Sequence, residues 1–220
     1  MDLYRWNSAL ALATFDDLAA IEVAMRSAMA QALVDQYGIR WYQRQDILDD
    51  ATLKLIAKAW SQGKLGSLAA ASPEVLHGKL VATLMFGFWV KILGRGGYQG
   101  QGPARQRRIY DTVLWKLALR QAFPNVGDLE RVIVEKAANQ LQQIRNRVAH
   151  HEHIIWGVPI PGQVNPDGSV RRISVSDSHV AVLDLAGYLS ADLRGWLQDH
   201  SQVPSTMARC PLPDPKLLHL

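Results

Sequence analysis

The sequence contains only one cysteine, Cys210, among its 220 residues. A disulfide framework and a cysteine-rich zinc site are therefore excluded, since both need several cysteines. The start of the chain, "MDLYRWNSAL", also lacks the cationic segment and apolar run of a signal peptide. Reduced thiols are typical of the cytosol, so we expect a cytoplasmic protein.

Long apolar runs are absent as well. The longest, "LVATLMFGFWV" at 80–90, ends at Lys91. Because a helix that crosses a bilayer needs about 20 apolar residues, we expect this run in a protein core and expect no membrane partner. The apolar fraction of 48% is typical of globular proteins. The formal net charge of +4 is compatible with a nucleic-acid partner but does not require one.

Two common nucleotide and nucleophile motifs are missing from the chain. It has no Gly-Lys-Ser/Thr phosphate loop and no G-x-S-x-G elbow. The Gly-rich stretch "GRGGYQGQGP" at 94–103 does not match G-x-G-x-x-G and follows no strand pattern. We therefore interpret it as a loop inside one domain.

What the sequence does have is apolar periodicity of three and four residues, which indicates helices. We predict helices over 3–12, 15–38, 50–62, 72–93, 104–123, 125–152 and 176–200. The second of these takes Asp16 or Asp17 as its N-cap. The turn signal "NPDG" at 165–168 interrupts the pattern.

These elements predict an all-α fold, a helical bundle with a short irregular or hairpin excursion near 155–175 and a C-terminal helix. We assign 1–200 to a single domain and 201–220 to a Pro-rich tail.

The stretch "LQQIRNRVAHHEHIIW" at 141–156 concentrates groups that carry chemistry. On a helix Asn146 and His150 are neighbours on one face, and Arg147 lies one turn before His150. Histidine can transfer protons near neutral pH, and arginine is suited to phosphate. A histidine base with an arginine clamp is the minimum equipment for metal-free RNA cleavage, in which the arginine would stabilise the phosphorane and the histidine would activate the ribose 2′-OH.

Two other interpretations of this stretch need no RNA. Cations near the C-terminal end of a helix complement its dipole, so a solvated helix end explains the same residues. The histidines of "HHEH" at 150–153 also suggest a metal site. Adjacent helical residues point about 100° apart and do not converge on one ion, however, so we predict no metal.

Three segments together are similar to one known family. "IRNRVAHHE" at 144–152 resembles the R-N-x-x-A-H-H-E signature of the Abi-like (abortive infection) family of the HEPN superfamily. "LAAIEVAMRSAMAQAL" at 18–33 and "GKLVATLMFGFWVKIL" at 78–93 resemble two other helices of that family. In order and spacing the likeness covers about residues 1 to 160.

The resemblance implies a HEPN-like helical bundle, usually a homodimer with its Arg and His motifs near the subunit interface. It also implies a metal-independent ribonuclease without a cofactor. Arg145, Asn146 and His150 match the family's motif, with Arg147 in support. His151 also satisfies the looser spacing of the superfamily, so the choice between the two histidines stays open.

Two further groups of residues have a structural and a functional interpretation. Glu22 and Arg26 are either a surface ion pair or a pair that borders the motif helix and orients Arg145 or His150. The densest basic patch is either a solvated helix start and loop or an RNA-contacting surface with a tyrosine for base stacking. It consists of Arg95, Tyr98, Arg105, Arg107 and Arg108.

The expected function is a metal-independent endoribonuclease of an anti-phage or toxin–antitoxin system. Its partners would be an RNA substrate, a second copy of the chain, and an antitoxin RNA or protein. One helix places Arg145 and His150 about 140° apart, which favours a homodimer that supplies more than one donor to each site. The alternative is a non-catalytic HEPN-type RNA- or protein-binding module.

Overall fold

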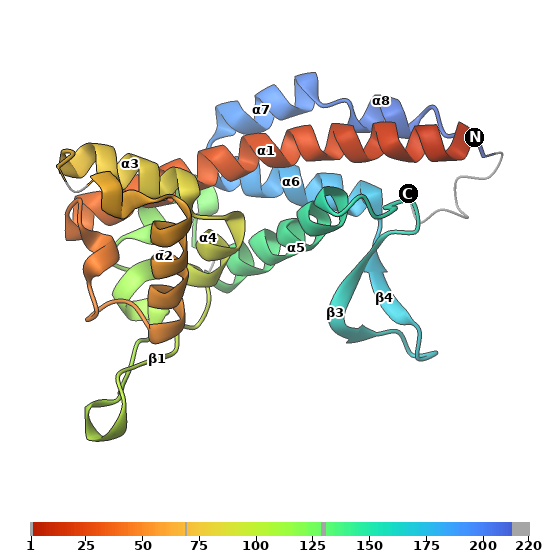
Figure 1. The fold of residues 1–220 in the computed structure, drawn as a ribbon. Helices are drawn as coiled ribbons and strands as arrows, with labels where there is room; N and C mark the ends of the chain where they lie inside the picture. Colours follow the sequence, from red (N-terminus) through yellow and green to blue (C-terminus); the bar gives the residue numbers. More distant parts are fainter. Residues whose placement is uncertain (1, 69, 129–130, 213–220) are drawn as a thin grey trace. The chain divides into compact units, whose positions relative to one another are not determined.

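The computed structural model of the chain describes residues 2–68, 70–128 and 131–212. The described residues are mostly helical with two short antiparallel hairpins, so the all-α prediction is confirmed at that level (Figure 1). They form two compact units, the first from 1–22 and 136–220 and the second from 23–135. The expected domain over 1–200 therefore covers the second unit and most of the first, and the two longest helices contribute residues to both.

The first unit is built on the start of helix α1 and the end of helix α5. Its elements are α1 (Asp2–Tyr37), α5 (Arg131–Ala149), β3 (Val158–Val164), β4 (Val170–Ile173), α6 (Val175–Leu189), α7 (Ala191–His200) and α8 (Val203–Met207). Leu10, Leu141, Leu185 and Leu197 are fully buried in this unit. Removing such side chains from water is the main force that holds its helices together.

The β3–β4 hairpin lies inside the excursion that the turn signal predicts. Asn165 and Gly168 form the turn, in which the Gly168 N–H donates to the Asn165 carbonyl at 2.9 Å. At the base of the hairpin, Gly157 has a φ of +71°, and a Cβ atom there would lie 2.6 Å from the Ile173 carbonyl oxygen. Only glycine fits this position, because both the backbone conformation and the space exclude a side chain.

The predicted break between 3–12 and 15–38 is wrong, because α1 is one continuous helix. The stretch between them contains no Gly or Pro, and Asp17 is not an N-cap but a buried residue inside the helix. Its carboxylate oxygen accepts a hydrogen bond from Ser201 Oγ at 2.6 Å and lies 3.4 Å from His179 Nδ1. Partners far away in the sequence therefore stabilise an acidic residue that locally resembles a helix start.

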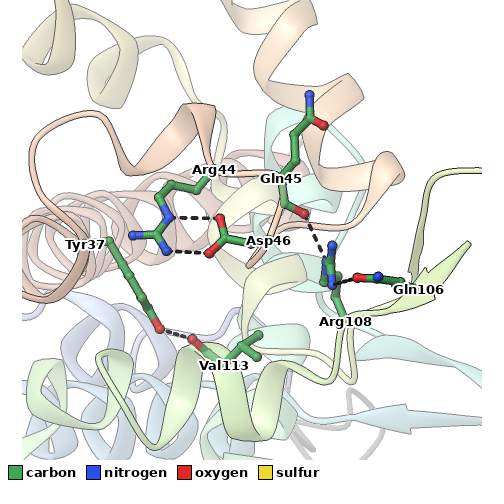
Figure 2. Close-up of polar contacts among 7 residues, drawn as sticks. All are labelled: Tyr37, Arg44, Gln45, Asp46, Gln106, Arg108 and Val113. Atoms are coloured by element: carbon green, nitrogen blue, oxygen red, sulfur yellow. Dashed lines mark hydrogen bonds and ion pairs between the residues drawn. The ribbon is translucent and has the colours of Figure 1, made fainter. Parts of the chain in front are cut away.

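The second unit contains the remaining helices and the other hairpin. Its helices and strands are α2 (Asp50–Gln62), α3 (Pro73–Thr83), α4 (Phe86–Ile92), β1 (Tyr98–Gln99) and β2 (Gln106–Arg107). Short helical turns complete it at Trp41–Gln43, Leu65–Leu68, Gly102–Ala104, Asp111–Trp115, Leu119–Ala122 and Pro124–Val126. The hydroxyl of Tyr37 donates to the Val113 carbonyl and so ties the end of α1 to the turn at Asp111–Trp115 (Figure 2).

Two predicted helices of the second unit are divided. The segment 72–93 forms α3 and α4, which are bent by 98°. No single helix of the described residues is long and apolar enough to cross a membrane, although this bent pair passes that test by length and composition.

The segment 104–123 forms β2 and two short helical turns instead of one helix. Its first residues pair with β1, and the buried Tyr110 hydroxyl donates to Thr52 Oγ1 at 2.7 Å and accepts from the Asp49 N–H at 3.1 Å. Burial raises the pKa of Tyr110 to about 12, so the phenol keeps its proton. These tertiary contacts override the helical pattern.

Replacing the buried Asp17 by alanine should lower the free energy of unfolding by about 1–3 kcal/mol, because the half-buried Ser201 hydroxyl and His179 ring lose their partner. Urea unfolding of the two proteins measures the difference. Asp16→Ala is the matched control, since Asp16 is exposed and has no such contact, and we expect a change within about 0.5 kcal/mol. Equal effects of the two substitutions would contradict this role of Asp17.

Candidate functional site

The predicted motif lies on the last two turns of α5, where its residues occupy different sides of the helix. At about 100° per residue, Asn146 and His150 are about 40° apart, whereas Arg145 and His150 are about 140° apart. Arg145 shares its side of α5 with the buried Ala138 and Leu141. The helix therefore directs Arg145 toward the core of the first unit and His150 toward solvent.

Arg145 is paired with Glu22 of α1. Arg145 Nε lies 3.7 Å from Glu22 Oε2, and the two side chains are 26% and 21% exposed. This Nε atom is buried and makes no hydrogen bond. A single carboxylate thus compensates the guanidinium charge in a poorly hydrated position, where such an attraction is screened less than at the surface. No ion pair joins Glu22 to Arg26 among the described residues.

The end of α5 has the hydrogen bonds of a Schellman motif. The His151 N–H donates to the Val148 carbonyl at 3.0 Å, and the Glu152 N–H donates to the Arg147 carbonyl at 2.9 Å. His151 adopts a φ of +57°, a left-handed conformation that glycine usually supplies at this position. His150 is the last residue before this reversal, so the backbone separates the two adjacent histidines.

Arg147 holds the chain that leaves the motif. Its Nη1 lies 3.2 Å from Glu152 Oε2, and its Nε and Nη2 donate to the His153 carbonyl at 3.3 and 3.2 Å. The loop is then attached to α1, because the Ile154 N–H donates to Asn7 Oδ1 at 3.1 Å. Arg147 therefore already has partners within the chain, whereas the side chains of Asn146 and His150 have no hydrogen bond or ion pair among the described residues.

His151 and His150 also differ in their surroundings. His151 and Glu152 line a cavity of about 560 Å³ together with residues of α1. Large apolar side chains of α1 border it with exposed fractions of 74% for Tyr4, 70% for Leu12 and 40% for Phe15. His150 does not line this cavity. Each histidine is exposed, but only His151 faces an apolar surface.

The predicted basic patch belongs to the second unit and surrounds β1 and β2. The Arg105 guanidinium lies over the ring of Tyr98, 3.9 Å from its centroid. Arg108 donates to the Gln45 carbonyl at 3.0 Å and to Gln106 Oε1 at 2.9 Å (Figure 2). Arg108 thus stabilises the hairpin. Arg105 covers one face of the tyrosine that was expected to stack on bases.

Arg95 and Arg107 of this patch are exposed. The start of 104–123, predicted as a helix, is part of the hairpin instead, so the cations of the patch are not a solvated helix start.

Cationic residues that the sequence analysis did not select line a second cavity of the first unit. We call this cavity, of about 550 Å³, the hairpin groove, because α5 and the β3–β4 hairpin line it. Its polar lining includes Lys136, Gln140, Gln143, Gln163, Arg171 and Arg172. The sequence signal for it was the "RR" pair at 171–172, but only the folded hairpin brings these arginines and the side chains of α5 to one groove.

Among the described residues, no group of three or more His, Cys, Asp or Glu side chains is arranged to hold a metal ion. Comparisons with protein-family models, with curated proteins and with solved structures found no match for this chain.

Replacing His151 by glycine should leave the protein as stable as the wild type or stabilise it by up to about 1 kcal/mol, because glycine adopts the left-handed conformation without steric cost. His151→Ala keeps that cost and serves as the reference variant. Thermal unfolding of the two variants gives the comparison. A His151→Gly protein less stable than His151→Ala would contradict the left-handed conformation of this residue.

Proposed function

We propose that the protein is a metal-independent endoribonuclease that acts in the cytoplasm in an anti-phage (abortive infection) or toxin–antitoxin system. Its helices would then be a HEPN-like bundle of the Abi-like type. The observation that carries the proposal is the exposed His150 with the half-buried Asn146 on the same face at the end of α5, next to an arginine that Glu22 compensates. An imidazole whose ring has no partner in the described chain can accept a proton from a substrate.

In the proposed reaction, His150 takes the proton of a ribose 2′-OH, and the oxygen attacks the adjacent phosphorus. The bond from phosphorus to the 5′-oxygen breaks, and a protonated histidine returns a proton to that oxygen. The products are a 2′,3′-cyclic phosphate and a 5′-hydroxyl end. Arg145 stabilises the charge on the phosphorane oxygens, and Asn146 orients His150 or the phosphate.

A homodimer is part of the proposal, because one helix does not direct Arg145 and His150 to the same phosphate. A second copy would complete each site with the arginine of one chain and the histidine of the other. The exposed apolar residues Tyr4, Leu12 and Phe15 beside the motif support this arrangement. Apolar side chains of this size at the surface are typical of contacts between proteins.

The second candidate function is a non-catalytic HEPN-type module that binds RNA or a protein such as an antitoxin. The position of Arg145 favours it, because the guanidinium faces Glu22 and its Nε is buried. An arginine that stays in this pair supports the fold and does not reach a phosphate. Cleavage of RNA separates the two candidates.

Purified protein incubated with mixed cellular RNA in EDTA should cleave it to fragments with 2′,3′-cyclic phosphate ends. His150→Ala should reduce the rate by about 10²- to 10⁴-fold, because the general base is lost. Arg145→Ala should reduce it by about 10²- to 10³-fold, because the developing charge loses its stabilising donor.

The matched control is His153→Ala, since His153 is exposed in the same loop and contributes only its carbonyl oxygen to the observed contacts. This variant should cleave at the wild-type rate. Intact RNA at high concentrations of wild-type protein, or an unchanged rate for His150→Ala, would overturn the proposed activity.

A further inference from the structure

The hairpin groove shares helix α5 with the motif. Three cations, Lys136, Arg171 and Arg172, line it against one carboxylate, Asp177. Its other polar lining groups are amides, including those of Gln140 and Gln143. Amides donate and accept hydrogen bonds without charge. Cations interleaved with amides suit a ligand that carries both phosphates and hydroxyl groups.

The lining of the groove on α5 continues into the motif. Lys136, Gln140 and Gln143 follow one another at spacings of four and three residues, so they form one stripe along the helix. The next positions of the same stripe are Arg147 and His150. At 1.5 Å per residue, His150 lies about 10 Å beyond Gln143 along the helix axis. A strand in the groove is therefore directed toward the exposed imidazole.

The two arginines of the hairpin make hydrogen bonds within the chain through only some of their N–H donors. Arg172 Nη1 donates to the Gly157 carbonyl at 3.0 Å, and Arg171 Nη1 lies 3.4 Å from Gln163 Oε1. A guanidinium has five N–H donors, and these contacts engage only Nη1 of each. Both side chains are otherwise exposed. The remaining donors suit the paired oxygens of a phosphate.

We infer that the hairpin groove binds the sugar–phosphate backbone of single-stranded RNA and guides it to His150. This inference rests on the proposed function for what happens at His150, but the binding itself needs no catalysis. The phosphates would contact Lys136, Arg171 and Arg172, and the amides of Gln140 and Gln143 would contact ribose hydroxyls. We favour RNA over an acidic protein segment because the stripe of α5 that lines the groove leads to His150, the group proposed to act on RNA.

The test is the binding of a short fluorescent single-stranded RNA that keeps its ribose hydroxyls, by proteins that all carry His150→Ala so that the RNA is not cleaved. Fluorescence anisotropy measures its affinity for the protein with the wild-type groove and for the groove variant, which also carries Lys136→Gln and Arg171→Gln. Loss of two phosphate contacts should weaken binding by about tenfold or more. It should also reduce the slope of log affinity against log salt concentration by about 1.4, since each phosphate contact on a single strand contributes about 0.7.

The matched control is Arg194→Gln with Arg209→Gln, which removes the same charge from exposed positions of the same unit outside the groove. Its affinity should stay within about twofold of the wild type at moderate salt, where distant charges are screened. Equal unfolding temperatures of the three proteins show that the substitutions leave the fold intact. Arg171→Glu alone provides a second variant, and it should also bind more weakly than the control.

The outcomes separate this inference from the proposed activity. Weakened binding by the groove variant supports the groove even if no RNA is cleaved in EDTA, a result that would overturn only the ribonuclease. Wild-type affinity of the groove variant would overturn the groove even if the protein cleaves RNA. Binding of polyglutamate that is as tight as RNA binding and equally sensitive to the variant would also overturn it, in favour of an acidic protein partner.

Discussion

The angle between Arg145 and His150 around α5 is the constraint on which the rest of the site depends. About 140° separates them, so the same helix that exposes the histidine directs the arginine toward the core. Glu22 compensates the arginine there at 3.7 Å. The fold thus keeps a cation close to the surface without presenting it beside the imidazole, and our proposal of a site completed by a second copy follows from this geometry.

The reversal of the chain after α5 fixes the direction of the histidines. A left-handed His151 ends the helix, Arg147 binds the departing loop, and Asn7 holds Ile154 against α1. His151 is thereby brought to the cavity lined by α1 residues, whereas the side chain of His150 has no partner within the described part of the chain. The structure gives adjacent histidines different environments, and this difference favours His150 as the group that exchanges protons with a substrate.

Local patterns in the sequence predicted the helix that carries the motif, the shared face of Asn146 and His150, and the hairpin turn at "NPDG". They failed where distant residues decide the outcome. Asp17 resembles a helix start in the sequence, but its partners in the fold are Ser201 and His179. Tyr110 is held by hydrogen bonds to Thr52 of α2 and to Asp49, the residue before α2. The hairpin groove could not be predicted either. Strand β4 carries Arg171 and Arg172, and no local sequence pattern indicates which face of α5 this strand approaches.

The most direct test of the central claim is RNA cleavage in EDTA by co-expressed Arg145→Ala and His150→Ala chains. If each site takes its arginine from one copy and its histidine from the other, mixed dimers contain one intact site. The mixture should then recover about a quarter of the wild-type activity, because half of randomly assembled twofold dimers are mixed. A mixture as inactive as the separate variants, beside an active wild-type protein, would contradict the account.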